Sequence, residues 1–227
     1  MQPFYIDIDR DTNLVTLVGV SFKELAPLFP IVPDNILFLK MYTDKAVFDP
    51  ALCAFFLQGE EAVSHMFGGD APDSLAFVDY KKNAKQFLSE KEFARFAAAA
   101  DNFVMPSNPY SATLDNQYLY LSEGNAIKLF LKNTDRFVPM LSRLVLQRFF
   151  DPDVLPPPDS TIMYQLQNLC AGGALFTADK TAGCKIWTIG RPVLDQIKFF
   201  LQGDAVPASA GHLLNVNRSG KWKLQAK

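Results

Sequence analysis

The most apolar stretch of the chain, Thr134 to Phe150, is followed at once by the strongest break in its pattern. Apolar residues recur there at helical spacing, at Leu141, Leu144, Val145 and Phe149. Pro139 stands in the first turn, where its missing N–H loses no partner, so the pattern predicts a helix from about Val138. Apolar side chains cover more than one stripe of this helix. It is therefore covered by the core on several sides, or in part by another chain.

Residues 151–159, DPDVLPPPD, end this helix and predict a linker. Proline fixes φ, removes a backbone donor and biases the preceding residue toward extended backbone, so neither Pro152 nor the run 156–158 continues a helix. The run favours polyproline II conformation. Because no basic residue flanks it, we interpret it as a stiff spacer rather than as a ligand for a proline-binding domain.

Alternation of apolar and polar residues predicts strands near the start of the chain. Residues 4–9 alternate, which puts the carboxylates of Asp7 and Asp9 on the wet side of a half-buried strand. A β-rich run at 14–20 completes a predicted hairpin. The sequence SFKE at 21–24 is a capping box, which predicts the start of a short helix.

The centre of the chain predicts further strands and helices. Predicted strands span residues 36–43, 74–80, 117–121 and 126–132, the last two as a hairpin. Asp49 followed by Pro50 is a typical helix start, and the predicted helix runs to Phe67. A capping box at 89–92 predicts an alanine-rich helix.

After the linker, strands at 174–177 and 185–189 flank a predicted turn, and Pro192 opens an amphipathic helix. Residues 161–169 fit a strand or a helix equally well. From Asp204 the pattern is lost. These elements predict an α+β fold with a main body over residues 1–150, a linker over 151–159, a small αβ unit over 160–206 and a polar, basic tail over 207–227.

Composition favours packed apolar surfaces over polar ligand sites. The chain of 227 residues is 49% hydrophobic and contains 20 Phe residues, which bring large apolar area without a polar group. A net charge of −2 and a pI of about 5.7 argue against broad nucleic-acid binding. No apolar run is long enough to span a membrane, and we expect no secretory signal.

The cysteines, Cys53, Cys170 and Cys184, are odd in number and have no close pair, which argues against a disulfide framework. We therefore expect a reducing compartment and a cytoplasmic location. With His65 and His212 they form no metal-binding motif, and no phosphate loop or nucleophile elbow occurs. We expect no metal and no cofactor. We interpret Cys170 and Cys184 as buried structural residues rather than nucleophiles paired with His212.

Asp7 and Asp9 are the strongest candidates for chemistry. An aspartate followed two residues later by a second one, after a strand, resembles the motif of haloacid dehalogenase-like phosphatases, which implies a nucleophile and Mg²⁺-dependent hydrolysis. Asp11 stands where that family prefers Thr or Val, and no acidic pair that would complete the metal site follows. A calcium loop is excluded, because Thr12 and Val18 stand where it needs Gly and an acid. Carboxylates on an edge hairpin also serve solubility alone.

Three segments carry the candidate partner-binding residues. These are Tyr110 and Leu114 in a predicted loop, Phe149 and Phe150 at the end of the central helix, and Arg218, Trp222 and Lys223 in the tail. Tryptophan is common at interaction hot spots, and basic residues accompany it here. A solvated terminus, or a contact with nucleic acid or anionic lipid, are open alternatives for the tail.

We therefore expect a non-enzymatic protein-interaction module. It would be an adaptor or structural subunit, peripheral to a larger cytoplasmic assembly such as a bacterial secretion or viral machine, with other protein subunits as partners. Two alternatives stay open. One is a small Mg²⁺-dependent, phosphatase-like hydrolase that uses Asp7 and Asp9, and the other is nucleic-acid binding through the basic tail.

Overall fold

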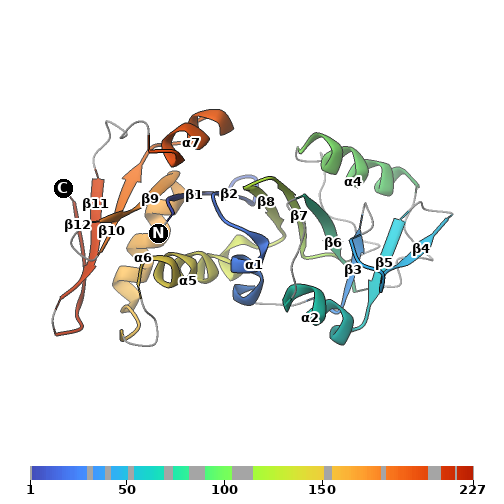
Figure 1. The fold of residues 1–227 in the computed structure, drawn as a ribbon, viewed down its shortest axis with the longest axis horizontal. Coiled ribbons are helices and arrows are strands. Elements are labelled where there is room, and N and C mark those ends of the chain that lie inside the picture. Colours follow the sequence, from blue (N-terminus) through green and yellow to red (C-terminus); the bar gives the residue numbers. More distant parts are fainter. Residues whose placement is uncertain are drawn as a thin grey trace. The chain divides into compact units, whose positions relative to one another are not determined.

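The computed structural model divides the chain into two units, which we describe separately. The first comprises Met1–Asp11, Val15–Val20 and Thr134–Lys227, and the second comprises Thr12–Leu14 and Ser21–Asn133. The structure describes residues 2–29, 33–38, 42–50, 54–68, 74–81, 90–103, 115–150, 155–179, 183–203, 211–217 and 219–226. Both units combine helices with antiparallel strands, as the predicted α+β class requires (Figure 1). The boundaries predicted at residues 150 and 160 do not coincide with these units.

The second unit is built on an antiparallel sheet with the strand order β8-β7-β6-β3-β5-β4. Its strands are β3 (Asn35–Phe38), β4 (Val47–Asp49), β5 (Ala54–Gln58), β6 (Leu75–Asp79), β7 (Tyr118–Glu123) and β8 (Ala126–Leu131). The helices among its described residues are α1 (Phe22–Leu25), which continues into a 3-10 turn at Ala26–Leu28, α2 (Glu60–Gly68) and α4 (Glu90–Asn102). The predicted capping box is confirmed, because Ser21 Oγ accepts the Glu24 N–H and the Glu24 carboxylate accepts the Ser21 N–H.

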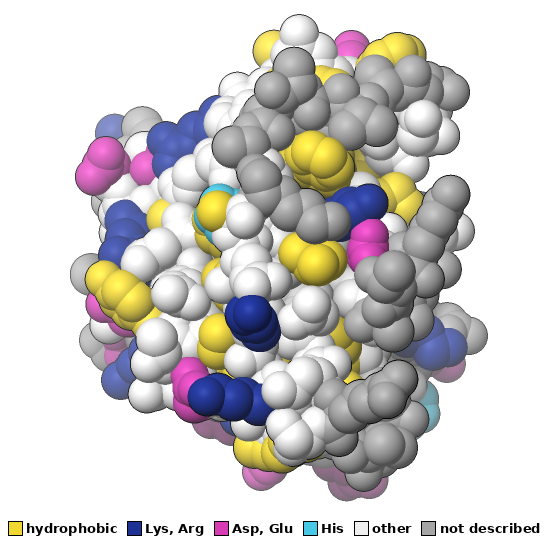
Figure 2. Space-filling view, turned by 90° about the vertical axis from the view of Figure 1, so that its left-hand side faces the viewer, with side chains coloured by type: hydrophobic (Ala, Val, Ile, Leu, Met, Phe, Trp, Pro, Cys, Tyr) yellow, Lys and Arg dark blue, Asp and Glu magenta, His cyan; other side chains and the backbone are white. Residues whose placement is uncertain are grey.

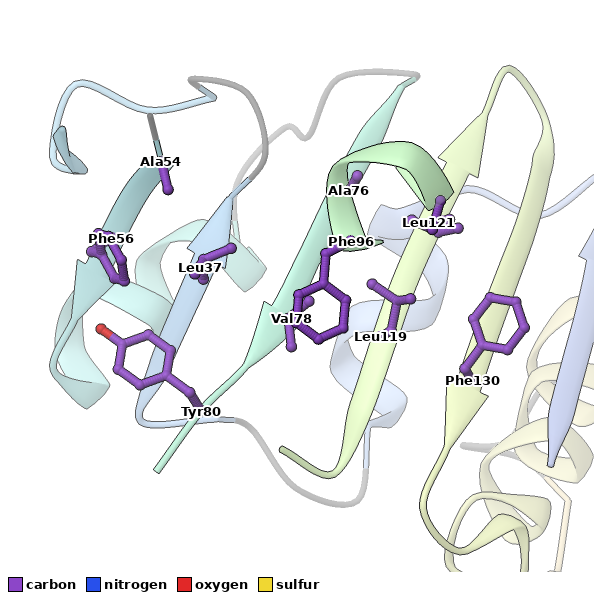
Figure 3. Close-up of a cluster of buried hydrophobic side chains, with 11 residues drawn as sticks. Leu37, Ala54, Phe56, Ala76, Val78, Tyr80, Phe96, Leu119, Leu121 and Phe130 are labelled. Atoms are coloured by element: carbon purple, nitrogen blue, oxygen red, sulfur yellow. The ribbon is translucent and has the colours of Figure 1, made fainter. Parts of the chain in front are cut away.

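Both faces of this sheet are apolar, which accounts for much of the phenylalanine content. Helix α4 supplies Phe96 to one face, where it packs with Val78 and its neighbours (Figure 3). On the other face, Phe22 of α1 and Phe67 of α2 contact the ring of Phe77, with centroids 6.0 and 6.1 Å away. Alternate residues of β6 thus pack against helices on opposite faces of the sheet, so the sequence of this strand is continuously apolar.

The first unit has the strand order β12-β11-β10-β9-β1-β2. Its strands are β1 (Phe4–Asp9), β2 (Leu14–Val18, of which residues 15–18 belong to this unit), β9 (Ala174–Asp179), β10 (Gly183–Thr188), β11 (Gly211–Val216) and β12 (Trp222–Ala226). Its helices are α5 (Val138–Phe149), preceded by a 3-10 turn at Thr134–Arg136, α6 (Ser160–Ala171) and α7 (Leu194–Leu201). The central helix predicted from Val138 is confirmed, with Pro139 in its first turn.

Strand register defines one face of the first-unit sheet from β1 to β12. Residues directly opposite each other share a face, and the register links Phe4 to Phe176, Phe176 to Ile186, Ile186 to His212 and His212 to Ala226. Because side chains alternate along a strand, the other members of the alternating set in β12, residues 222 and 224, lie on this same face.

Helix α5 packs on this face through a stack of three aromatic rings. Phe4 lies between Phe149 and Phe176, with centroids 5.6 and 5.0 Å away and nearly parallel planes. The guanidinium of Arg148 lies 4.7 Å from the centroid of Phe4, and its Nη1 donates to the carbonyl of Gly19 at 2.6 Å. Phe149 is therefore a core residue that holds α5 on the sheet.

The helix predicted from Asp49 is wrong over its first half. Strand β4 ends at Asp49, β5 occupies residues 54–58, and α2 begins only at Glu60. Gly59 separates strand from helix with φ +94, a value that suits glycine, and its N–H donates to the carbonyl of Asp34. A short apolar run such as AFFL fits both periodicities, and Pro50 after Asp49 favoured the wrong one.

The predicted tail is also corrected, because residues 211–216 and 222–226 form the paired strands β11 and β12. Lys223 and Gln225 alternate with apolar residues there, and because they are polar the sequence did not indicate a strand.

The ambiguous segment 161–169 lies in α6, whose N-terminal N–H at Ile162 donates to the carboxylate of Asp159 at 2.9 Å. The predicted hairpins at 117–132 and 174–189 are confirmed.

Asp79 is a buried carboxylate in the second unit. Its Oδ1 accepts the N–H groups of Gln117 at 2.8 Å and Tyr118 at 2.7 Å, and its side chain is held at the end of β6. Burial raises the pKa of Asp79 from 3.8 to about 6, although these hydrogen bonds oppose the shift. The folded chain therefore binds this proton more tightly than the unfolded chain does.

We expect Phe149→Ala to lower the free energy of unfolding of the first unit by about 3–5 kcal/mol, because it removes a ring from the stack on Phe4. Phe150→Ala, at the half-buried neighbouring position, is the control and should cost about 1 kcal/mol. Urea unfolding followed by tryptophan fluorescence measures both, since Trp187 and Trp222 belong to the first unit. Equal losses in the two variants would contradict the core assignment.

Asp79 should make the second unit more stable as the pH falls. Because its folded pKa lies above its unfolded value, the unfolding free energy should rise by about 1 kcal/mol between pH 7 and pH 5 relative to Asp79→Asn. The asparagine variant keeps the Oδ1 acceptor and removes the titration. Urea unfolding of both proteins followed by circular dichroism gives this difference, and a difference that does not change with pH would refute it.

Candidate functional site

The indole of Trp222 is held between helix α5 and the proline run. Its Nε1–H donates to the carbonyl oxygen of Pro156 at 2.7 Å. Its ring meets that of Phe150 edge to face, with centroids 4.8 Å apart. Trp222 is only 8% exposed. The structure thus brings together two segments that the sequence suggested as separate contact surfaces, the end of the central helix and the region around Trp222.

Local backbone geometry explains this meeting. Helix α5 ends at Phe149, and the extended backbone of Phe150 (φ −134, ψ 160) leads out of the helix before the proline run. Ahead of β12, the side-chain oxygen of Asn217 accepts the N–H of Lys221 at 2.9 Å, and Gly220 adopts φ +77. This tight turn starts β12 at Trp222.

A groove of about 270 Å³ lies beside this contact, and we call it the Trp222 groove. Its lining is Arg143, Leu146, Gln147, Phe150, Leu155, Pro156, Pro157, Pro158 and Trp222. The volume lies just below the range of roughly 300–1,000 Å³ typical of small-molecule sites, so the groove is small for a whole small-molecule ligand. The indole N–H is already bonded. The groove therefore offers apolar surface, with the polar side chains of Arg143 and Gln147 beside it.

A second pocket, of about 390 Å³, adjoins the same strand, and we call it the His212 pocket. It is lined by Gln165, Asn168 and Leu169 of α6, His212 of β11, and Leu224 and Ala226 of β12. His212 Nδ1 is buried and has no hydrogen-bond partner among the described residues. The sequence did not predict this pocket, because residues 207–227 have the composition of a polar tail. The alternation of Trp222, Leu224 and Ala226 was the signal that would have revealed it.

The structure assigns different positions to the predicted partner-binding residues. Phe150 and Trp222 line the Trp222 groove, and Lys223 is exposed on the opposite face of β12. Phe149 is 5% exposed, so it belongs to the core rather than to an accessible surface. The remaining candidates, Tyr110, Leu114 and Arg218, lie outside the described residues.

The candidate nucleophiles Asp7 and Asp9 are both paired with Arg191. Arg191 Nε lies 2.9 Å from Asp7 Oδ2, and its Nη1 lies 3.4 Å from Asp9 Oδ2. Asp7 is 6% exposed, and burial raises the pKa of its carboxyl while Arg191 opposes the shift. The residue before Arg191 is also held in place, because the Tyr5 hydroxyl donates to the carbonyl of Gly190 at 2.8 Å. The prediction that these carboxylates lie on the solvent-exposed face of an edge hairpin is wrong, because β1 lies between β9 and β2.

The two described thiols are buried and free of disulfides. Burial raises the pKa of Cys170 to about 12, and it also raises the pKa of Cys184. Both thiols therefore stay protonated at neutral pH, where a nucleophile would need the thiolate. Within the described ranges, no group of three or more His, Cys, Asp or Glu side chains is placed to hold a metal ion.

Charged groups on the face that Figure 2 shows are dispersed. Lys and Arg side chains are scattered among uncharged and hydrophobic ones, and several lie beside Asp or Glu. Nucleic-acid binding proteins typically gather basic side chains in a patch or stripe. In the part of the chain that the structure describes, no helix is long and apolar enough to cross a membrane.

The chain matches no family model, no curated protein and no solved structure. The function proposed below is therefore derived from the residues of the two pockets.

The hydrogen bond from Trp222 to Pro156 should stabilise the first unit measurably. Trp222→Phe keeps a ring in place and removes the donor, so it should lower the unfolding free energy by about 1 kcal/mol. Trp222→Ala also removes the ring and should cost about 3 kcal/mol or more. Urea unfolding followed by the fluorescence of Trp187 reports both values. If both variants unfold like the parent protein, the indole does not hold the proline run.

Proposed function

We propose that this protein is a non-enzymatic interaction module that binds a segment of another protein in the Trp222 groove. It acts as an adaptor or structural subunit of a cytoplasmic assembly. The observation that carries the proposal is an apolar groove whose central indole is fixed from two sides, by Phe150 and by Pro156. A preorganised aromatic anchor in a small pocket is typical of binding hot spots.

The chemistry of the groove favours a protein ligand. Leu146 and Phe150 are half-buried, and Pro156 and Pro157 are exposed, so these residues leave apolar surface for a ligand to cover. Proline side chains are rigid, so covering them costs little conformational entropy. The exposed side chains of Arg143 and Gln147 give a partner polar groups at the same site, in the pattern of an apolar centre with a polar rim.

Site-specific photo-crosslinking tests the proposal. A benzophenone amino acid in place of Gln147, which lines the groove, should capture the same partner in repeated preparations from the native host. In place of Tyr164, which is 64% exposed on α6 and does not line the groove, it should not. The captured protein is then identified, purified and titrated against the full chain.

Two variants of groove residues, with a control that matches the charge change of Arg143→Glu, separate the groove from the rest of the surface. Arg143→Glu and Leu146→Glu should each weaken binding of the purified partner at least about tenfold, since hot-spot substitutions cost upwards of 1.4 kcal/mol. Arg136→Glu, an exposed charge reversal that does not line the groove, should leave the affinity unchanged. Equal binding by all three variants would refute the proposed function.

A further inference from the structure

Strand β12 ends the strand order of the first unit. It pairs with β11 through five residues, from His212 opposite Ala226 to Val216 opposite Trp222. Among the described residues it has no partner on its other side. Such an edge presents outward-facing N–H and C=O groups, which another extended segment can satisfy. In the second unit, the edge strand β4 is only three residues long, so β12 offers the longer template.

Both pockets open along one face of this edge strand. Trp222 lines the Trp222 groove, and Leu224 and Ala226 line the His212 pocket. These are alternate residues, so their side chains share the face that carries α5 and α6. A strand paired with β12 would place its own alternate side chains beside them, at the two pockets in turn.

The two pockets differ in the side chain that they suit. The Trp222 groove is walled by aromatic and proline side chains and suits a large apolar side chain. In the His212 pocket, Gln165 and Asn168 offer amide groups and His212 Nδ1 lacks a partner, so this pocket suits a hydroxyl or amide. On β12, the residues that line the two pockets, Trp222 and Leu224, are two positions apart. A partner strand would therefore also use residues two positions apart.

The opposite face of β12 is basic. Lys223 alternates with the pocket residues and is exposed, and Lys221 is exposed just before the strand. A partner strand would present its other set of side chains on this face. Acidic residues there would pair with Lys223, whereas basic ones would be repelled.

We propose that an extended segment of another protein adds to β12 as a further strand, with apolar and hydroxyl side chains in the two pockets and acidic side chains toward Lys223. This inference rests on the proposed function and names the chemistry of its partner. Main-chain hydrogen bonds supply affinity, and the pockets supply specificity, as in other cases of strand addition.

A second copy of the chain is a poorer occupant of this edge. Pairing two β12 strands would bring Lys221 and Lys223 of both chains to one face, where like charges oppose association. Lysine on an edge strand is a recurrent device against such self-pairing.

The probe for this inference is a fluorescein-labelled peptide of about seven residues, Glu-Leu-Glu-Thr-Glu-Leu-Glu, a length typical of strands. The full chain should bind it in anisotropy titrations. A peptide of the same composition with its apolar and acidic residues in separate blocks should bind at least about tenfold more weakly. A peptide that is N-methylated at two alternate amides keeps its side chains, but those amides can no longer donate hydrogen bonds to β12. Two such peptides cover the two alternating sets of amides. The peptide whose methyl groups block the donors to β12 should bind at least about tenfold more weakly.

Matched variants of the protein locate the binding face. Lys223→Glu should weaken peptide binding about fivefold at low salt, and Leu224→Asp should weaken it further. Lys91→Glu makes the same charge change on α4 of the second unit and should have no effect. In a variant with Trp187→Phe, the remaining indole of Trp222 should change its emission when the peptide binds.

The outcomes separate this inference from the proposed function. No peptide binding up to about 1 mM, or equal binding by the alternating and N-methylated peptides, overturns strand addition. The groove function would still stand if Arg143→Glu and Leu146→Glu weaken binding of the purified partner. Concentration-dependent dimerisation that Leu224→Asp abolishes would assign the edge to a second copy and overturn the inference as well.

Discussion

The packing of α5 on the first-unit sheet, through the ring of Phe4 between Phe149 and Phe176, is the interaction on which the candidate site depends. It sets where α5 ends, and therefore where Phe150 and the proline run begin. The strand register places Trp222 of β12 on the same face of the sheet as Phe176 and Ile186. Trp222 therefore contacts Phe150 at the end of α5. The groove thus depends on the ring stack at Phe4 and on the strand register from β1 to β12. The residues of that stack do not line the groove.

The phenylalanine content has two different consequences in the two units. In the second unit, alternate residues of one strand pack against helices on opposite faces of the sheet, which uses aromatic area for stability. In the first unit, Phe149 and Phe150 are neighbours in sequence with different roles. One is buried in the ring stack, and the other is half-buried beside the groove. A sequence motif of two adjacent aromatics therefore combines a core residue with a surface residue.

Periodicity over long segments predicted the central helix and the hairpins, whereas the composition of short segments led to wrong predictions. The helix from Val138 and the hairpins were predictable because their apolar spacing has one interpretation. Strand β12 was not, since Lys223 and Gln225 give it the composition of a tail. The pairing of Asp7 with Arg191 joins residues from opposite ends of the chain, which no local pattern reveals. The same holds for the groove, which needs α5, the proline run and β12 together.

Hydrogen–deuterium exchange of the full chain, with and without the purified partner that crosslinking identifies, tests directly whether the partner adds a strand to β12. We expect slower exchange at the backbone amides of Trp222 to Ala226 when the partner is bound, because new ladder hydrogen bonds cover that edge. We also expect protection around the end of α5. Protection confined to other segments, with exchange along β12 unchanged, would contradict strand addition.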